Sequence, residues 1–337
     1  MSLRAGIAAI DYALPAKTVS NAELASEYPA WEMGLVAKQT GVVSRHIAET
    51  AETALDLSEV ACRKLFQRIG LDPNEVAGLV VCTQTPDYIM PPNACLLQDR
   101  LELSKRVAAF DFTLACSGFI YGLFLAKGLI ESSALKNVLL VTADTYSRLI
   151  HPADRTTRSL FGDGAAATFI KAGPKGLGDF LLGTDGSWGQ SFIVRAGGAR
   201  YSRTVPATEL SVDRNGSVRS PEHIEMDGSQ VLAFIKREIP GCVRGLLEKA
   251  GKTPKDIDVI VPHQASHVTL DFLKKSLGLP AERFFTNMKY IGNTVSASIP
   301  IALRDAELGG VLVPGQTVLL IGFGVGLSWG ACLVEWI

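Results

Sequence analysis

Two segments of the chain, 181 positions apart, repeat one pattern of glycine, proline, an acid and an apolar run. The first is Gly70-Leu-Asp-Pro-Asn-Glu-Val-Ala-Gly-Leu-Val-Val-Cys82, and the second is Gly251-Lys-Thr-Pro-Lys-Asp-Ile-Asp-Val-Ile-Val-Pro-His263. Further along, Asn137-Val-Leu-Leu-Val141 resembles Thr317-Val-Leu-Leu-Ile321 at an offset of 180. Because both matches have nearly the same offset, they indicate a duplicated half rather than coincidence.

Each half contains short apolar runs separated by helical stretches, which is typical of βαβ units with helices covering a mostly parallel sheet. We therefore predict an α/β fold of two duplicated halves, residues 1–175 and 176–337. The runs predicted to be buried strands are Leu79–Cys82, Val107–Phe112, Val138–Thr142, Val259–Val261 and Val318–Ile321.

Other local signals define helices and loops. Ser20-Asn-Ala-Glu23 is a capping box that predicts a helix start, and Leu55–Ile69 has helical periodicity. Gly118–Ile130 is apolar almost all round, which predicts a central buried helix. Glycine-rich turns are expected at Phe161–Gly164 and Gly322–Gly326, and a long surface loop or lid at Ala196–Asp227.

Charge and cysteine content narrow the function. The 33 Lys+Arg and 34 Asp+Glu give a net charge of −1, which argues against nucleic acid as the main partner. No run of 18 apolar residues is present, so no transmembrane helix is expected. The six cysteines form no CxxC and no regular framework, and the histidines do not cluster with them, so neither a disulfide scaffold nor a zinc site is expected. We expect a cytoplasmic protein.

Cys116 is the first candidate for chemistry. It follows the strand expected at Ala108–Phe112 and precedes the apolar helix that begins at Gly118. A thiol at a helix N-terminus lies at the positive end of the helix dipole, which favours its thiolate. The alternative is a buried structural cysteine, the commonest fate of a free Cys.

His263 and Asn293 become candidates through the duplication. Taken alone, His263 is explained as a core or turn histidine at the end of a strand, and Asn293 as a helix N-cap. However, Cys116 and Asn293 both open helices that lead to the matching strands at Val138 and Val318. Since a pseudo-twofold duplication brings corresponding elements together, all three side chains could surround one pocket at the sheet ends.

Several motifs span essentially the whole chain. They are Gln39-Thr-Gly-Val-Val-Ser-Arg-His46, Thr113-Leu-Ala-Cys116-Ser-Gly-Phe, Asp154-Arg155, Phe161-Gly-Asp-Gly-Ala, His263-Gln-Ala, Gly292-Asn293-Thr-Val-Ser-Ala-Ser and Gly322-Phe-Gly-Val-Gly-Leu-Ser-Trp-Gly330. In their sequence and their order they resemble β-ketoacyl-acyl-carrier-protein synthase III of the thiolase-like superfamily. The resemblance implies a five-layered αβαβα fold and a homodimeric condensing enzyme of fatty acid biosynthesis.

The resemblance implies a role for each catalytic residue. Cys116 would take an acyl group from acyl-CoA or acyl-carrier protein and form an acyl-enzyme. His263 and Asn293 would donate hydrogen bonds to the thioester carbonyl of malonyl-acyl-carrier protein and stabilise the enolate left by carbon dioxide. Backbone N–H groups of Cys116 and of the turn Gly324, Val325 and Gly326 would hold the oxyanion formed on attack. The product is a 3-oxoacyl thioester, and no metal or redox cofactor is implied.

The residues implied in substrate delivery depart from the family pattern. Leu35 stands where the housekeeping enzymes have a tryptophan that stacks on adenine, and Gln39 where they have a phosphate-binding arginine. Arg155 matches the adenine site, and Met90 a position that reaches across the dimer interface into the partner's acyl pocket. Ser266-His267-Val268 replaces an Asn-x-Arg whose arginine docks the carrier protein. These departures predict a specialised member; the alternative is drift of surface contacts with unchanged activity.

Other reactions on the same fold are alternatives to condensation. A thiolase needs a second cysteine in the turn Gly322–Gly326, which has none, and elongating synthases have histidine where Asn293 stands. An acyltransferase that moves the Cys116-bound acyl group to an alcohol or amine would use His263 as general base. A non-catalytic partner subunit would not be acylated at all.

Overall fold

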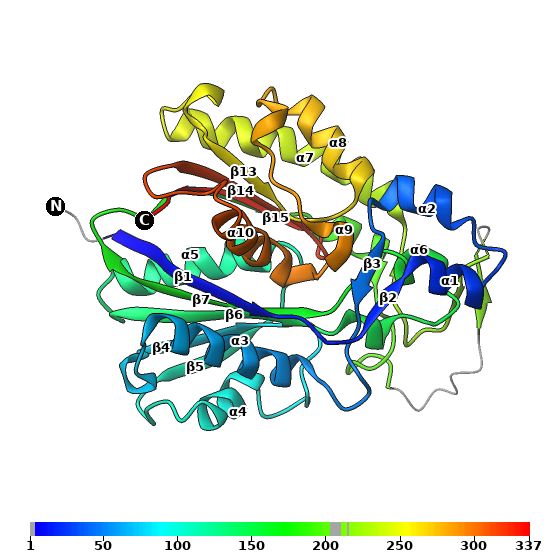
Figure 1. The fold of residues 1–337 in the computed structure, drawn as a ribbon, viewed down its shortest axis with the longest axis horizontal. Helices are drawn as coiled ribbons and strands as arrows, with labels where there is room; N and C mark the ends of the chain where they lie inside the picture. The colour runs from blue at the N-terminus through cyan, green and yellow to red at the C-terminus, as the bar shows by residue number, and fades with distance from the viewer. Residues whose placement is uncertain (1–3, 203–209, 214–215) are drawn as a thin grey trace.

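Helix and sheet layers alternate through the molecule (Figure 1). The computed structural model describes residues 4–202, 210–213 and 216–337. Helices cover the outer face of each sheet and also lie between the two sheets, so the expected thiolase-like αβαβα fold is confirmed. The layer helices are α3 (Ala54–Ile69) and α4 (Asn93–Arg100), then α5 (Gly118–Glu131) and α10 (Ser298–Leu308) in the centre, then α7 (Gly228–Lys249) and α8 (His267–Ser276).

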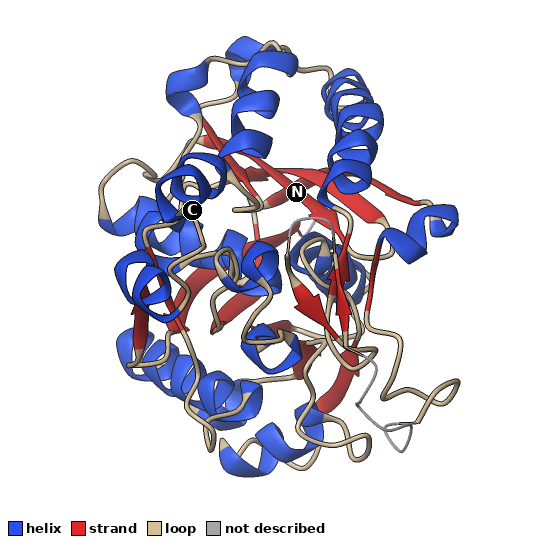
Figure 2. Ribbon diagram, turned by 90° about the vertical axis from the view of Figure 1, so that its right-hand side faces the viewer, coloured by secondary structure: helices blue, strands red, loops and turns tan. Residues whose placement is uncertain are grey.

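Each half of the chain supplies one sheet. The first sheet has the order β1-β7-β6-β4-β5 and the second the order β13-β14-β15-β8. The view at right angles shows both sheets with helices between and outside them (Figure 2). The strands are β1 (Arg4–Ala13), β4 (Gly78–Cys82), β5 (Ala108–Phe112), β6 (Asn137–Asp144) and β7 (Gly164–Gly173), and β8 (Leu177–Thr184), β13 (Val259–Pro262), β14 (Thr317–Gly324) and β15 (Ser328–Glu335).

The repeat of the sequence is a repeat of structure. Helices α3 and α7 are each followed by a left-handed glycine, Gly70 at φ 64° and Gly251 at φ 61°. A 3₁₀ turn and a buried strand follow in both halves, β4 and β13. Strand β4 pairs in parallel with β6, and β13 pairs in parallel with β14. The carboxyl ends of matching strands therefore lie at corresponding edges of the two sheets.

Short elements cluster at one end of the molecule, at the right in Figure 1. The stretch Ala196–Asp227, expected as a surface loop, contains three two-residue strands among its described residues. The short elements are α1 (Asn21–Glu27), α2 (Met33–Thr40), α6 (Arg155–Arg158) and α9 (Met288–Ile291), and the strand pairs β2 (Thr18–Ser20) with β3 (Ser44–His46), β9 (Phe192–Ile193) with β12 (Glu225–Met226), and β10 (Ser211–Val212) with β11 (Val218–Arg219).

Three local predictions need correction. Strand β5 is not buried, because it is the edge strand of its sheet and leaves Phe110 37% exposed. Helix α5 lies between the sheets but is not buried all round, since Phe124 is 48% exposed. Residues Gly322 to Gly324 belong to β14 rather than to a turn, and only residues 325–327 turn the chain into β15. The capping box of Ser20 and Glu23 is confirmed.

Within the described ranges, no helix is both long enough and apolar enough to cross a membrane.

Candidate active site

Cys116 lies in the turn between β5 and α5, where it is 3% exposed. Its side chain packs directly on the end of β14: a Cβ atom placed on Gly324 would be 2.8 Å from Cys116 Cβ and 3.1 Å from Sγ. A glycine is therefore required at 324 for this approach. The hydroxyl groups of Ser117 and Ser328 are 2.7 Å apart, and Ser328 donates to the carbonyl oxygen of Val325 at 2.9 Å. These bonds hold the turn that follows β14 against the residue after Cys116.

The thiol of Cys116 does not have the low pKa expected from its place before a helix. Burial raises its pKa well above the ordinary value, and the nearby carboxylate of Asp144 raises it further. Loss of water outweighs the helix dipole here because the side chain is nearly inaccessible.

His263 follows β13 and is fixed on three sides. Its N–H donates to the carbonyl oxygen of Ile321 at 2.7 Å, and its ring lies edge-on to Phe323 with 5.5 Å between ring centroids. Its Nδ1 is 2.7 Å from Oγ of Ser298. Burial lowers the pKa of His263 to about 3, so the imidazole is neutral at physiological pH.

The Ser298 hydroxyl can select the tautomer of that neutral ring. The N–H of Gln264 donates to Ser298 Oγ at 3.4 Å, and in this arrangement the hydroxyl hydrogen can bond Nδ1 of His263. With Nδ1 accepting, the ring proton is on Nε2. Nε2 is then a hydrogen-bond donor that points away from Ser298.

Asn293 presents its amide nitrogen beside that donor. Its Oδ1 accepts from the N–H of Val295 at 2.9 Å, which fixes which way the amide faces. Nδ2 lies 3.4 Å from both Nε2 of His263 and the carbonyl oxygen of Ala265. With the ring proton on Nε2, both nitrogens carry hydrogen, and at 3.4 Å the pair is better arranged to share one acceptor than to bond each other.

The geometry brings the three sequence-derived candidates to one place, the carboxyl end of β14. Gly324 contacts Cys116, Phe323 contacts His263, and His263 adjoins Asn293. The backbone of Asn293 is also held by the first half of the chain, because its N–H donates to Leu160 and its carbonyl accepts from Gly162. The site is thus assembled from both halves of the duplication.

The residues expected to deliver substrate are on the surface. Leu35 on α2 is 51% exposed, Gln39 is on the same helix and exposed, and Met90 is 79% exposed in the loop before α4. Arg155 is the half-buried first residue of α6. In the segment that replaces Asn-x-Arg, Ser266 caps α8, His267 lies 3.2 Å from Asp271, and Val268 is 44% exposed.

Sequence reasoning missed Asp144, the last residue of β6. This carboxyl group is fully buried; one oxygen accepts from the Ser296 hydroxyl at 2.5 Å and the other from the N–H of Gln84 at 2.8 Å. Burial raises its pKa to about 7. The motif that begins at Gly292 contains two serines at alternate positions, Ser296 and Ser298. These two hydroxyl groups were the sequence signal that could have pointed to a buried polar partner such as Asp144.

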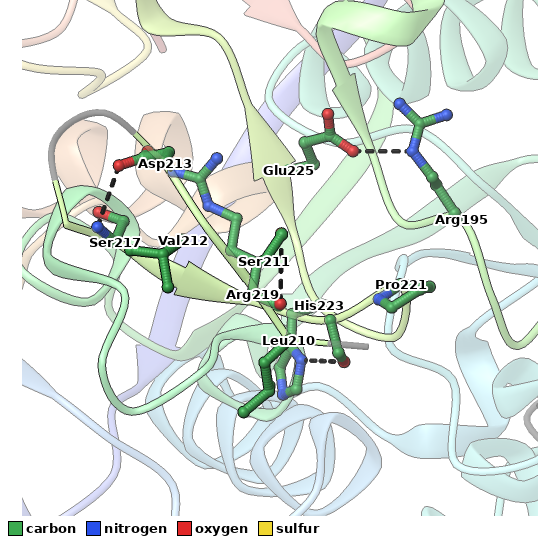
Figure 3. Close-up of a pocket in the computed structure, with 11 residues that line it drawn as sticks. Arg195, Leu210, Ser211, Val212, Asp213, Ser217, Arg219, Pro221, His223 and Glu225 are labelled. Carbon is green, nitrogen blue, oxygen red and sulfur yellow. Dashed lines mark hydrogen bonds and ion pairs between the residues drawn. The ribbon is translucent and has the colours of Figure 1, made fainter. Parts of the chain in front are cut away.

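A cavity of about 560 Å³ lies in the stretch expected to be a loop (Figure 3). Both arginines that line this cavity form ion pairs with nearby carboxylates. Arg195 pairs with Glu225 at 2.8 Å. Arg219 pairs with Asp154 at 2.8 Å and with Asp213 at 3.0 Å. Arg219 thereby fastens this stretch to the residue that caps α6.

Comparison with known proteins agrees with the fold. Family models for 3-oxoacyl-[acyl-carrier-protein] synthase III and for its C-terminal part match residues 110–186 and 247–336. The chain is 37% identical over 327 residues to β-ketoacyl-[acyl-carrier-protein] synthase III 3 of Streptomyces coelicolor, covering 96% of this chain and 94% of that one. A crystal structure of a 3-oxoacyl-(acyl-carrier-protein) synthase III superposes with a TM-score of 0.96 at 42% identity, covering 99% and 100% of the two chains. The priming β-ketosynthase of the R1128 polyketide pathway superposes with a TM-score of 0.87 at 30% identity, covering 99% and 96%.

The fold and the buried Cys, His and Asn at the end of β14 define a thiolase-like protein. The chain belongs to the β-ketoacyl-acyl-carrier-protein synthase III family.

Proposed function

We propose that the protein is a decarboxylating condensing enzyme that joins an acyl group carried on Cys116 to malonyl-acyl-carrier protein. The observation that carries this proposal is the pair of nitrogens, Nε2 of His263 and Nδ2 of Asn293, which lie 3.4 Å apart at the end of β14, the strand end that also contacts the buried Cys116. Two fixed donors at one point suit the negative charge that develops on a thioester oxygen when carbon dioxide leaves.

The reaction has two steps. In the first, the sulfur of Cys116 attacks the donor thioester carbonyl, the carrier thiolate leaves, and that thiolate takes up the thiol proton. In the second, the malonyl C–C bond breaks, carbon dioxide leaves, and the enolate carbon attacks the acyl-Cys116 carbonyl. The Cys116 sulfur then leaves and takes a proton from solvent, and a 3-oxoacyl thioester remains on the carrier. Decarboxylation makes the nucleophile, so no base has to remove a proton from carbon.

The pKa of His263 supports a donor role over a base role. A general base works best when its pKa is near the working pH. With a pKa of about 3, the His263 ring takes up a proton poorly, but as a neutral Nε2–H it still donates a hydrogen bond. This favours condensation over transfer of the acyl group to an alcohol or amine, which would need His263 as the base.

The assay combines an acyl-CoA panel, malonyl-acyl-carrier protein carrying ¹⁴C in its carboxyl group, and the purified enzyme. The proposal predicts release of labelled carbon dioxide together with a 3-oxoacyl-carrier product identified by mass spectrometry. Transfer of the acyl group to an alcohol or amine without carbon dioxide would favour the acyltransferase. Absence of any acylation of Cys116 would favour a non-catalytic subunit.

We further propose that coenzyme A is bound more weakly here than in housekeeping members. Leu35 offers no aromatic face for adenine, and such stacking is worth about 1–3 kcal/mol per base on other proteins. Gln39 adds no charge for phosphate, which leaves Arg155 as the matching adenine-site group. Acyl-carrier protein or a short pantetheine thioester should then compete well as donor. Calorimetry with a non-hydrolysable acyl-CoA tests this: the double variant Leu35→Trp, Gln39→Arg should bind more tightly than the natural chain, and tight natural binding that it does not improve would refute the proposal.

A further inference from the structure

A second cavity, about 330 Å³ in volume, opens between the loop after β3, the loop after β6 and helix α6. Its wall includes none of the residues assigned above to catalysis or substrate delivery. Four cationic side chains and one carboxylate contribute to the wall, along with Phe161 and smaller groups. The charged residues are Lys17, Arg45, Glu49, Arg148 and Arg158.

Arg45 is the unusual member of this group. Its side chain is fully buried, and its guanidinium donates to Val19 O at 2.9 Å and Ser159 O at 2.8 Å, and to Oδ1 of Asn21 at 2.5 Å. These acceptors are all neutral. Within the described residues, no carboxylate pairs with it and its Nε has no hydrogen-bond partner. A buried charge without a counter-ion is costly, and removing a partner from such a charge typically costs several kcal/mol.

Arg148 extends the same pattern. Its Nη2 donates to three backbone carbonyl oxygens, those of Glu49 at 3.2 Å, Thr50 at 2.8 Å and Glu52 at 2.7 Å. The third arginine, Arg158, is paired with Glu27 at 2.8 Å and so contributes little net charge. Behind the wall, the buried carboxyl group of Asp163 accepts from Ala48 N–H and from Ser147. Two arginines hydrogen-bonded only to neutral acceptors, together with exposed Lys17, outnumber the single carboxylate of Glu49, so the cavity wall has a net positive charge.

We propose that this cavity binds a phosphate-type oxyanion, either free phosphate or a phosphate monoester. A guanidinium presents a planar fork of donors that matches phosphate oxygens, and such charge-assisted bonds are among the strongest a protein makes. Glu23 attracts Arg45 without bonding it, and an anion beside Lys17 and Arg148 would add counter-charge at the wall that Arg45 shares with them.

The site adjoins the catalytic centre through the backbone. A Cβ atom on Gly292 would lie 2.9 Å from Cβ of Arg45, so the strand that carries Arg45 packs directly against the residue before Asn293. Gly162 also packs against Arg45 and Gly292, and its N–H donates to the carbonyl oxygen of Asn293 at 2.9 Å. An anion that restrains Arg45 therefore restrains the backbone that positions Asn293. This coupling rests on the proposed function, whereas the binding site itself does not.

Isothermal titration of the whole protein with inorganic phosphate, in a phosphate-free buffer at constant ionic strength, tests the site. We expect saturable binding at one site per chain. Lys17→Gln should weaken that binding about tenfold, the effect of one lost charge-assisted contact. Lys17 is exposed, so this variant should fold; the matched control Lys171→Gln, exposed on β7 and outside the cavity, should bind phosphate as the natural chain does.

Two further arms separate the sources of the anion. Glycerol 3-phosphate, a monoester that is no part of coenzyme A, would identify a monoester ligand if it competes with phosphate and loses affinity in Lys17→Gln, and phosphate binding alone would identify the free ion. Undetectable binding, or binding unchanged by Lys17→Gln, would overturn the proposal. If acyl-CoA displaced phosphate from Lys17→Gln as readily as from the natural chain, the phosphate would be bound in the substrate site. That result would also overturn the proposal. The condensation assay is not needed for any of these results.

Discussion

The Ser298 hydroxyl lies 2.7 Å from Nδ1 of His263, while Asn293 approaches the other ring nitrogen. When Ser298 donates to Nδ1, the buried imidazole donates in one direction only, from Nε2 toward the amide of Asn293. Ser298, five residues beyond Asn293, thus orients the His263 ring beside the Asn293 amide.

Replacing Asn293 with alanine should slow decarboxylation of malonyl-carrier protein by roughly 10²–10³-fold, the usual loss for one oxyanion donor. His263→Ala should show a similar loss. Acylation of Cys116 should be affected much less in both variants, because the donors act on the malonyl thioester. Labelled carbon dioxide and intact-protein mass spectrometry measure the two steps separately.

The exposed Asn74→Ala is the matched control for Asn293→Ala and should leave both steps unchanged. A variant at 293 or 263 that lost acylation but kept decarboxylation would show that the two steps had been assigned to the wrong residues. Full product formation in Asn293→Ala would favour the acyltransferase instead.

Decarboxylation should not depend on the protonation of His263 between pH 5 and 8. Burial lowers the pKa of His263 from an ordinary 6.5 to about 3, so the ring stays neutral throughout this window. The measurement uses Cys116→Ala, which removes the thiol, combined with Asp144→Asn, which removes a buried carboxyl group whose pKa of about 7 falls in this window. A step in rate centred near pH 6.5 in this double variant would mean that His263 titrates normally.

Asp144→Asn should lower the pKa of the Cys116 thiol. The carboxyl of Asp144 is ionised above its pKa of about 7, and its negative charge disfavours the thiolate. Alkylation by iodoacetamide at pH 8 should therefore be faster in the variant, by about tenfold for each pKa unit removed. Exposed Asp72→Asn is the control; equal alkylation rates in the Asp144 variant and the natural chain would exclude this electrostatic effect.

The protein should form a homodimer. Strand β5 leaves one sheet edge unpaired within the described chain, and exposed apolar side chains accompany it: Phe110 is 37% exposed, Met90 79% and Ile89 93%. Such features mark association surfaces. Light scattering at micromolar concentration should give twice the chain mass, and Ile89→Asp with Met90→Asp should shift it toward the monomer. A monomeric natural chain would contradict this expectation.

The sequence predicted that the three candidate residues lie at one place because each one ends a strand or precedes a helix in a duplicated pattern. The repeat, together with the rule that the ends of matching strands meet, was enough to place Cys116, His263 and Asn293 together. The pKa of Cys116 was predicted in the wrong direction, because desolvation depends on burial by distant segments such as Gly324, which no local pattern reports.

The remaining errors have the same origin. Strand β5 was expected to be buried because its residues are apolar, but its exposure follows from the strand order of the sheet. Asp144 and Arg45 look like ordinary surface charges in the sequence, and only tertiary packing makes them fully buried. The substrate-delivery residues were identified only by resemblance, and their exposure agrees with a surface role without assigning one.

The central claim is that Cys116 carries the acyl group while His263 and Asn293 make the nucleophile. Intact-protein mass spectrometry after incubation with acyl donors, run beside the carbon dioxide assay on Cys116→Ala, tests it most directly. We predict that the natural chain gains the mass of one acyl group, and that Cys116→Ala gains none yet still decarboxylates malonyl-carrier protein. An acyl adduct or a 3-oxoacyl product formed by Cys116→Ala would contradict the account.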